Sequence, residues 1–283
     1  MVKIDSLIKR YGDFTLDISM EIPRGKVTGL VGRNGAGKTT TIKALLGLIK
    51  TDGGSVTVMG KDAASLTAED RKRIGAALAE SGFSGLLRVR DVADILAAMY
   101  DDADRDSFLR ICGKFGLPED KPIKEFSTGM KAKLRVLAAL SHRSDLLIMD
   151  EPTAGLDVEA RNEILDMLRD YLTENEDCSI LISSHISSDL ENLCDDIYLI
   201  NNGKIILHED TDRLLDSYGV MRVDEETYET LDRQHILAVR KENFGYSCFA
   251  DDRRYYEENC PGIVIQKGSI DDLILIMAGG ELL

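Results

Sequence analysis

The stretch Gly32-Arg-Asn-Gly-Ala-Gly-Lys38-Thr39 decides the fold of this chain. Its spacing is G-x-x-x-x-G-K-T, and it lies directly between an apolar run at residues 26–31 and a segment predicted to be a helix. The glycines let successive backbone N–H groups turn inward to form an anion-binding nest, and the positive end of the following helix strengthens it. The stretch is therefore predicted to be a phosphate-binding loop that joins a buried strand to a helix.

Two side chains of this loop have specific predicted roles. The Lys38 ammonium supplies a point charge for the β- and γ-phosphates of a nucleotide, and the Thr39 hydroxyl is placed to bind Mg²⁺. The loop alone does not distinguish kinases, GTPases, helicases and transport ATPases from one another. The residues assigned to nucleotide binding in this loop are Gly32, Asn34, Gly35, Ala36, Gly37, Lys38, Thr39 and Thr40.

Two apolar patterns predict two kinds of strand around the loop. Alternation of polar and apolar residues near the N-terminus predicts a half-exposed antiparallel sheet. Continuous apolar runs predict buried parallel strands, and two later runs joined by Asn201-Asn-Gly203 predict a hairpin. The alternating strands are expected at residues 2–7, 14–18 and 55–58, the buried strands at 26–31, 146–149 and 179–182, and the hairpin strands at 197–200 and 204–207.

The middle of the chain, residues 66–145, has a helical pattern. Apolar residues recur there at three- and four-residue spacing, so a helical insertion is expected between the first and second buried strands. After about residue 210, short strand and helix candidates alternate, which predicts a small α+β tail. The clearest helices in the middle are expected at 91–100 and 131–140, the tail strands at 235–239 and 263–266, and the tail helices at 251–258 and 270–277.

Composition and charge favour a cytoplasmic globular protein that does not bind nucleic acid. The 50 acidic and 35 basic side chains give a formal net charge of −15, which repels phosphate backbones and anionic lipid, although solubility alone also explains such acidity. No run approaches the roughly 18 apolar residues of a membrane span, and the N-terminus does not read as a secretory signal. The five cysteines include no CxxC pair, which favours a reducing compartment.

Polar residues that follow the later buried strands complete the predicted site. Asp150 and Glu151 follow the second buried strand, and His185 follows the third. Open α/β sheets place ligands at the carboxyl ends of such strands, which favours a site over two solvated acids. His185, taken singly, is more often a structural histidine. Ser127 precedes a predicted helix, where one interpretation makes it only the N-cap of that helix. It can also serve both roles, because a capped helix N-terminus suits a γ-phosphate.

In this order the motifs resemble the nucleotide-binding domain of ATP-binding-cassette (ABC) ATPases. Ser127-Thr-Gly-Met-Lys stands at the signature motif, Asp150-Glu151 at the end of the Walker B strand, and His185 at the switch histidine. Residues 154–157 stand at the D-loop, and the resemblance covers residues 1 to about 210.

The resemblance implies an α/β fold with a P-loop NTPase (RecA-like) core. It also implies an N-terminal antiparallel β subdomain and a helical subdomain inserted at about residues 83–142. The nucleotide-binding domain would then span residues 1–210, and a small C-terminal accessory α+β domain would span residues 211–283.

The resemblance also implies roles for the residues at the strand ends. Asp150 would hold Mg²⁺, Glu151 would act as general base toward the water that attacks the γ-phosphate, and His185 would contact that phosphate. Tyr11 stands where the family stacks an aromatic ring on adenine, although loop tyrosines are common.

The resemblance implies that Ser127 and Gly129 act on ATP held by the opposite subunit, and it assigns Asp157 of the D-loop to nucleotide binding. Two nucleotide-binding subunits, in a homodimer or a heterodimer, would therefore close head-to-tail over two nucleotides, and hydrolysis would let them part.

The sequence departs from the family pattern at two motifs. Glutamine occurs only at positions 234 and 266, so Glu80 stands at the position of the Q-loop glutamine and is assigned as a catalytic and metal-binding candidate. In the signature motif, Thr128 and Met130 stand where the family has Gly and Gln, so the match to the motif is incomplete. This incomplete match and the tail resemble the exporter-type subfamily of bacterial drug, antibiotic-resistance and peptide transporters.

The function implied by the resemblance is the ATP-hydrolysing subunit of an ABC transporter. It would couple ATP-driven dimerisation and hydrolysis to export through a separate transmembrane permease, and it would sit on the inner face of the cell membrane. Phe83, Leu86 and Leu87 are candidates for the permease contact and are equally explained as core residues. The competing hypothesis is a soluble ABC ATPase that powers a cytosolic assembly or regulatory complex.

Overall fold

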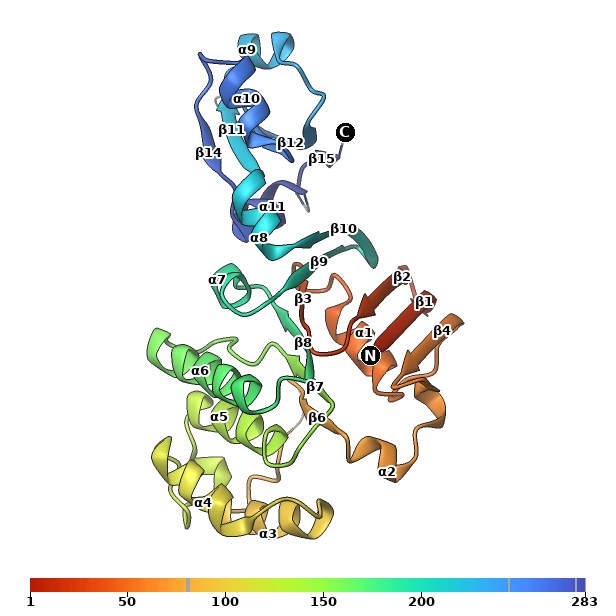
Figure 1. The fold of residues 1–283 in the computed structure, drawn as a ribbon, viewed down its shortest axis with the longest axis vertical. Helices are drawn as coiled ribbons and strands as arrows, with labels where there is room; N and C mark the ends of the chain where they lie inside the picture. Colours follow the sequence, from red (N-terminus) through yellow and green to blue (C-terminus); the bar gives the residue numbers. More distant parts are fainter. Residues whose placement is uncertain (80–81, 244, 278, 283) are drawn as a thin grey trace.

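Three β-sheets and their flanking helices form the fold (Figure 1). The computed structural model describes residues 1–79, 82–243, 245–277 and 279–282. The central sheet lies between the N-terminal sheet and a group of helices, and the third sheet extends from it as the tail (Figure 1). This arrangement agrees with the α/β class predicted from the sequence.

The N-terminal sheet is antiparallel, with strand order β2-β1-β4-β5. Every second side chain of β2 is buried from Leu16 to Ile22, so one face of the sheet is covered, as the alternating pattern predicted. The strands of this sheet are β1 (Val2–Tyr11), β2 (Phe14–Ile22), β4 (Gly53–Val58) and β5 (Lys61–Asp62).

The central sheet has the order β10-β9-β3-β8-β7-β6 and is parallel except for β10. All residues of β3, β7 and β8 are buried, because helices or the N-terminal sheet cover both faces. The turn between β9 and β10 holds Asn202 and Gly203 at φ 46° and 76°, as the hairpin prediction requires. The strands are β3 (Val27–Val31), β6 (Ile74–Ala77), β7 (Leu146–Asp150), β8 (Ser179–Ser184), β9 (Asp196–Asn201) and β10 (Lys204–Asp210).

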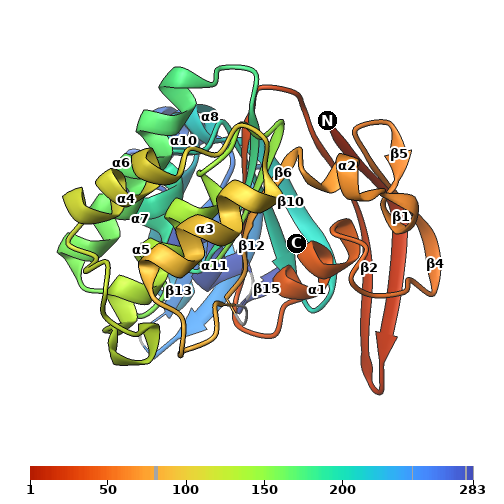
Figure 2. The same cartoon turned by 90° about the horizontal axis from the view of Figure 1, so that it is seen from below.

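Strand β6 corrects the expectation of an entirely helical segment at residues 66–145. It pairs in parallel with β7, so the helical insertion begins after this strand. Figure 2 shows α3 to α6 on one side of the central sheet, and α1 with the N-terminal sheet on the other. The helices and 3₁₀ turns of the first 191 residues are α1 (Lys38–Leu45), η1 (Ala63–Ser65), α2 (Ala68–Arg71), α3 (Val89–Met99), α4 (Arg105–Lys114), η2 (Ile123–Glu125), α5 (Thr128–Ala139), α6 (Val158–Glu174) and α7 (Ser187–Glu191).

The tail contains an antiparallel sheet with strand order β14-β11-β13-β12-β15. The predicted strands and helices of this region are present, together with two further helices and three further strands that the sequence patterns did not indicate. The elements are α8 (Thr211–Ser217), β11 (Gly219–Val223), α9 (Glu225–Thr230), β12 (Ile236–Glu242), β13 (Gly245–Ala250), α10 (Arg253–Asn259), β14 (Ile265–Lys267), α11 (Ile270–Met277) and β15 (Glu281–Leu282).

The hydrophobic core continues from the central sheet into the tail. One buried cluster joins Leu147 and Ile182 of the central sheet to Phe249 and Leu273 of the tail. A second cluster fills the space between the central and N-terminal sheets, and a third lies within the tail. The tail is therefore attached through buried apolar contacts as well as through the chain.

Candidate functional site

The phosphate-binding loop lies between β3 and α1, as predicted. A Cβ added at Gly32 would lie 2.3 Å from the Ile200 carbonyl oxygen, so only glycine lets the loop pass this close to β9. Gly37 has a φ of 119° immediately before α1 begins at Lys38. The Lys38 ammonium donates to the Gly32 carbonyl at 2.7 Å, and its side chain is only 6% exposed. The loop thus holds its lysine folded back over its own backbone.

Asp150 joins the loop to the neighbouring strands. Its carboxylate accepts hydrogen bonds from the Thr39 hydroxyl at 3.0 Å and from the Ser183 hydroxyl at 2.7 Å. It is 2% exposed at the end of β7. A buried carboxylate needs such partners, because burial without them costs several kcal/mol.

Glu151 has the most constrained geometry in the site. Its φ is 49°, a left-handed conformation that non-glycine residues rarely adopt, and such strain is common at functional positions. Its N–H donates to the Ser183 hydroxyl at 3.0 Å, which holds this turn. Its carboxylate lies between two partners, with Oε2 at 2.6 Å from His185 Nδ1 and Oε1 at 3.0 Å from Lys38 Nζ.

The Lys38–Glu151 contact is an ion pair and not an aligned hydrogen bond. Glu151 Oε1 is buried and, among the described residues, accepts no hydrogen bond of normal geometry. The pair therefore neutralises charge without satisfying the carboxylate oxygen. A polar group of a ligand can therefore replace either side chain as the partner of the other, because it can form the hydrogen bond that the ion pair lacks.

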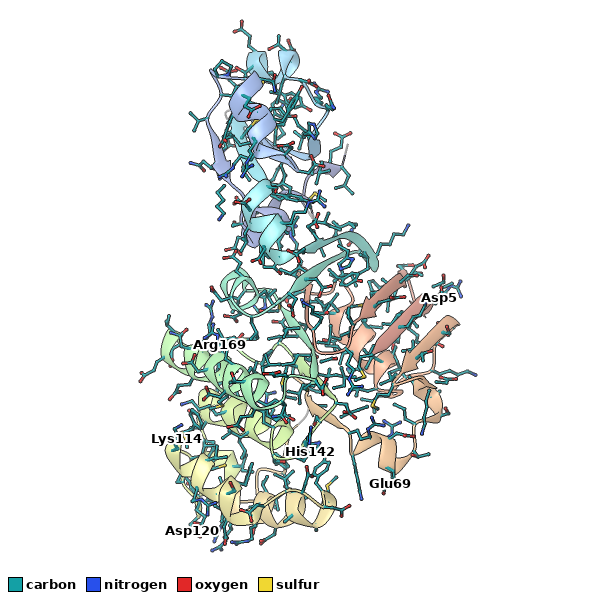
Figure 3. The ribbon with its side chains drawn as sticks, viewed as in Figure 1. Asp5, Glu69, Lys114, Asp120, His142 and Arg169 are labelled. Carbon is teal, nitrogen blue, oxygen red and sulfur yellow. The ribbon has the colours of Figure 1, made fainter. Side chains whose placement is uncertain are left out.

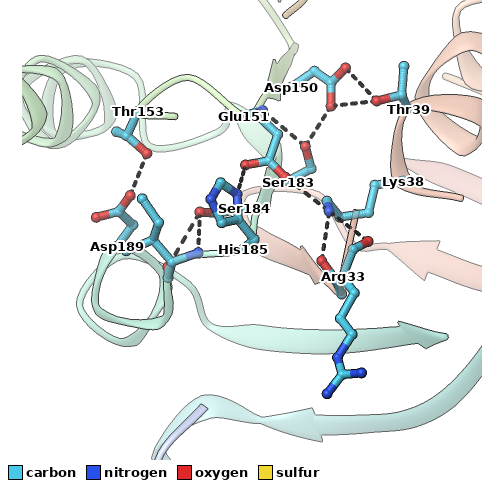
Figure 4. Close-up of polar contacts among 12 residues, drawn as sticks. Arg33, Lys38, Thr39, Asp150, Glu151, Thr153, Ser183, Ser184, His185 and Asp189 are labelled. Atoms are coloured by element: carbon cyan, nitrogen blue, oxygen red, sulfur yellow. Dashed lines mark hydrogen bonds and ion pairs between the residues drawn. The ribbon is translucent and has the colours of Figure 1, made fainter. Parts of the chain in front are cut away.

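These side chains meet at the carboxyl ends of three neighbouring strands (Figure 4). The phosphate loop follows β3, the two acids close β7, and His185 follows β8. Because these strands are parallel and adjacent, their ends lie along one edge of the sheet, where α/β folds place ligands. The predicted loop, acids and histidine are thus brought together.

Ser127, Gly129 and Asp157 form a second group around an open groove. This groove has a volume of about 480 Å³ and is lined by the start of α5 and the turn before α6. Ser127 is exposed, and its hydroxyl accepts the Met130 N–H at 3.2 Å as the cap of α5. The Asp157 carboxylate accepts the Ala160 N–H at 2.9 Å and caps α6.

Of the two remaining candidates, Tyr11 and Glu80, the structure describes only Tyr11. Tyr11 is 48% exposed at the end of β1 and pairs in register with Phe14. The Phe14 ring would lie 3.3 Å from a Cβ at Gly37, so the strand partner of Tyr11 lies beside the phosphate loop. Glu80 lies outside the described residues.

Two residues that sequence reasoning missed hold the site together. Ser183 bridges Asp150 and Glu151, and its position at the end of a buried strand was a signal that could have found it. Asp189, in α7, is fully buried and accepts a hydrogen bond from the Thr153 hydroxyl at 2.5 Å. It also pairs with Arg161 of α6. Asp189 had no signal in the sequence, because its partners come from distant segments.

Comparison with known proteins identifies the family. The family model for ABC transporters matches residues 15–154. The lantibiotic transport ATP-binding protein SrtF of Streptococcus pyogenes is 37% identical over 216 residues, which cover 75% of this chain and 92% of that protein. The bacitracin transport ATP-binding protein BcrA of Bacillus licheniformis is 35% identical over 210 residues, with 73% and 68% covered. A solved structure of the ATP-binding subunit of an ABC transporter matches with a TM-score of 0.67 and 25% identity, over 76% of this chain and 91% of that one.

The chain belongs to the ABC transporter family and has its P-loop NTPase fold. Within that family it is an ATP-binding and ATP-hydrolysing subunit of an exporter-type transporter.

Proposed function

We propose that this subunit drives export of an antibiotic- or peptide-class compound through a separate transmembrane permease. The observation that carries the proposal is the convergence of Lys38, Asp150, Glu151 and His185 at one edge of the central sheet. The substrate class rests on the relatives, which are named for lantibiotic and bacitracin transport. The same relatives favour a transporter over the competing hypothesis of a soluble assembly ATPase.

Each side chain of the site has a proposed role in hydrolysis. Lys38 leaves Glu151 and binds the β- and γ-phosphates. Glu151 orients the attacking water and accepts its proton, a contribution of roughly 10²–10⁴-fold to the rate. His185 contacts the γ-phosphate, and its hydrogen bond to Glu151 sets the direction of that carboxylate. The neighbouring loop residues Asn34, Gly35, Ala36 and Thr40 supply further contacts to the phosphates, and Tyr11 stacks on the base.

The site also fits Mg²⁺. The described residues contain no cluster of three or more His, Cys, Asp or Glu suited to a metal. Mg²⁺ in nucleotide sites needs only one or two protein oxygens, since phosphates and water supply the rest. The Thr39 hydroxyl and the Asp150 carboxylate, 3.0 Å apart, supply these two oxygens. When bound there, the ion would neutralise phosphate charge.

The second group of residues favours a two-subunit site. Ser127, Gly129 and Asp157 line an open groove, and the side-chain hydrogen bonds of Ser127 and Asp157 cap their own helices. The start of a capped helix in an exposed position suits an anion brought by another molecule. We therefore assign these residues to the nucleotide of a second nucleotide-binding subunit.

A separate groove on the helical region is the proposed permease contact. It has a volume of about 550 Å³, and Phe83, Lys124, Lys131 and Arg135 contribute to its lining. Leu86 is 77% exposed nearby in the chain, whereas Phe83 and Leu87 are half-buried against the main core. Of the three residues considered from the sequence, Leu86 is therefore the strongest contact candidate.

The proposed location is the inner face of the cell membrane, reached through the permease. Within the described ranges, no helix has the length and apolar character of a membrane span. We further propose residues 1–210 as the nucleotide-binding domain, with its helical subdomain at about 83–142, and residues 211–283 as the accessory domain.

Hydrolysis by the purified full chain and by its Glu151→Gln variant tests the proposed roles. The wild type should release phosphate from ATP in the presence of Mg²⁺, and the variant should bind ATP without turnover and form a stable dimer in light scattering. A Glu151→Gln protein that hydrolyses ATP normally, or stays monomeric at saturating ATP, would overturn the assignment. Purification of the native complex from detergent, followed by identification of a membrane-spanning partner, tests the transporter function separately.

A further inference from the structure

Helix α7 directly follows His185 and is held from two sides. On its inner side, the buried Asp189 carboxylate binds Thr153 and Arg161, which flank the turn before α6. Figure 4 shows Thr153 and Asp189 beside the segment that carries His185. On its other side, α7 packs against α11 of the tail.

The contact between α7 and α11 has polar and apolar components. The Ile270 N–H at the start of α11 donates to Glu191 Oε1 at 3.2 Å. Leu190 of α7 and Leu273 of α11 are both fully buried in the same hydrophobic cluster. A carboxylate at the beginning of a helix is also favoured by the helix dipole.

Gly279, two residues beyond the end of α11, lies near the side chain of Arg33. A Cβ added at Gly279 would lie 2.6 Å from Arg33 Nη2 and 2.7 Å from the Leu275 carbonyl oxygen. Arg33 is the second residue of the loop that holds Lys38. Ile270 therefore contacts the helix after His185, and Gly279 lies at the guanidinium of a phosphate-loop residue.

We propose that α11 is a positioning strut for His185. By packing on α7, it fixes the distance of the histidine from Glu151 and from the γ-phosphate, so turnover depends on a segment that contacts no nucleotide. A displacement of about 1 Å at a reacting group can cost up to 100-fold in rate. The inference rests on the proposed role of His185 in hydrolysis. It adds that the tail positions this histidine.

Replacement of Glu191 in the full chain tests the polar contact. Glu191→Ala should lower kcat for ATP by about 3–10-fold, the loss that one hydrogen bond accounts for. Glu191→Gln keeps an oxygen that can accept the Ile270 N–H and should restore most of the rate. The dissociation constant for ADP should stay unchanged in both variants, because ADP has no γ-phosphate for His185 to contact.

A double-mutant cycle separates this role from a general loss of stability. In a His185→Ala background, Glu191→Ala should cause no further fall in kcat, because its effect passes through the missing histidine. The apolar contact has a matched pair on the same helix, since Leu273 is fully buried and Leu275 is 44% exposed. Leu273→Ala should lower kcat, and Leu275→Ala should not.

The inference is wrong if Glu191→Ala turns over ATP like the wild type, or if its effect is equally large without His185. Should Leu273→Ala fail to fold, the Glu191 variants decide alone. An inactive wild type, or an active Glu151→Gln variant, would instead contradict the proposed function, so the two failures are distinguishable.

Discussion

Lys38 Nζ lies 3.0 Å from Glu151 Oε1, so the cation proposed to bind phosphate is paired with the carboxylate proposed to handle water. Both side chains are largely buried, with 6% and 13% of their surfaces exposed. The pair must separate before either residue can perform its role, and the nucleotide phosphates are the natural replacement partner of the lysine. Binding of the nucleotide and release of the Glu151 carboxylate are thus linked through the contact between Lys38 and Glu151.

Neutralising Glu151 should therefore strengthen nucleotide binding. Glu151→Gln removes the charge that competes for Lys38, and the dissociation constant for ADP should fall by about 2–5-fold, the range expected for one charge pair. ADP is the suitable probe, because it is not hydrolysed. Isothermal titration calorimetry measures the change, and Glu174→Gln, an exposed neutralisation at the end of α6, is the control. Equal affinity in the wild type and Glu151→Gln would show that the pair does not compete with phosphate.

Loss of the Thr39 hydroxyl should raise the Mg²⁺ requirement. Thr39→Val keeps the shape of the side chain but removes the donor to Asp150, and ATPase activity at low Mg²⁺ should fall about 10-fold or more. Thr39→Ser keeps the hydroxyl and should remain close to the wild type. Activity is measured over a Mg²⁺ titration, and EDTA should abolish it in all three proteins. A Thr39→Val protein with an unchanged titration curve would exclude this hydroxyl as a metal ligand.

Two inactive variants should complement each other if the site is shared. Lys38→Ala removes the phosphate cation, and Ser127→Arg blocks the exposed start of α5. A mixed dimer would contain one composite site with both native residues, so random mixing should recover about a quarter of the wild-type ATPase rate. Phosphate release from the equimolar mixture is compared with each variant alone. A mixture that stays inactive would favour a site within one chain.

His142 should make the fold sensitive to mild acid. Its ring is buried and stacks on Tyr100, with ring centroids 3.7 Å apart and an interplanar angle of 6° (Figure 3 shows its position). Burial lowers the pKa of His142 below its ordinary value of 6.5. The unfolded chain then binds the proton more readily, so the contribution of His142 to the free energy of unfolding is complete above about pH 6.5 and declines as pH falls.

His142→Phe tests this pH dependence, because it keeps a ring against Tyr100 without a titrating group. Urea unfolding at pH 7 and pH 5 should show a smaller loss of stability in the variant than in the wild type. An identical loss in both proteins would mean that other groups cause the acid sensitivity.

Gly75 should tolerate no side chain. A Cβ there would lie 2.4 Å from the Ala139 carbonyl oxygen and 2.5 Å from Leu147 Cδ2. Gly75→Ala should therefore lower the free energy of unfolding by about 1–3 kcal/mol through overpacking. Gly113→Ala in α4, where the added Cβ meets no described atom within 4 Å apart from its chain neighbours and the backbone of its own helix, should instead raise it by about 0.5–1 kcal/mol. Thermal denaturation of both variants measures the difference, and a neutral Gly75→Ala would contradict the close contact.

The parts of the fold that follow from local patterns were predictable. The phosphate loop, the buried strands and the acids at their ends each have a sequence signal that depends on neighbouring residues. Strand β6 was missed because Gly75 and the two alanines after it have little intrinsic strand preference. Packing against α5 and β7 decides their conformation.

The missed parts of the site depend on contacts between distant segments. Asp189 binds residues that lie 28 and 36 positions away in the chain. The contact between Glu191 and Ile270 spans 79 positions. No periodicity or motif spacing reports such pairs, because the topology of the sheet brings them together. The α+β class of the tail could thus be predicted from its sequence. The contacts that attach the tail to α7 could not be predicted in this way.

The cluster that joins Phe249 and Leu273 to the central sheet limits how freely the tail can be exchanged. A graft of another protein's tail onto this chain would have to match the apolar surface of α7, or leave that surface exposed to water. Any lineage that changes one half must therefore adjust the other, so the two halves are expected to diverge together and not as interchangeable modules.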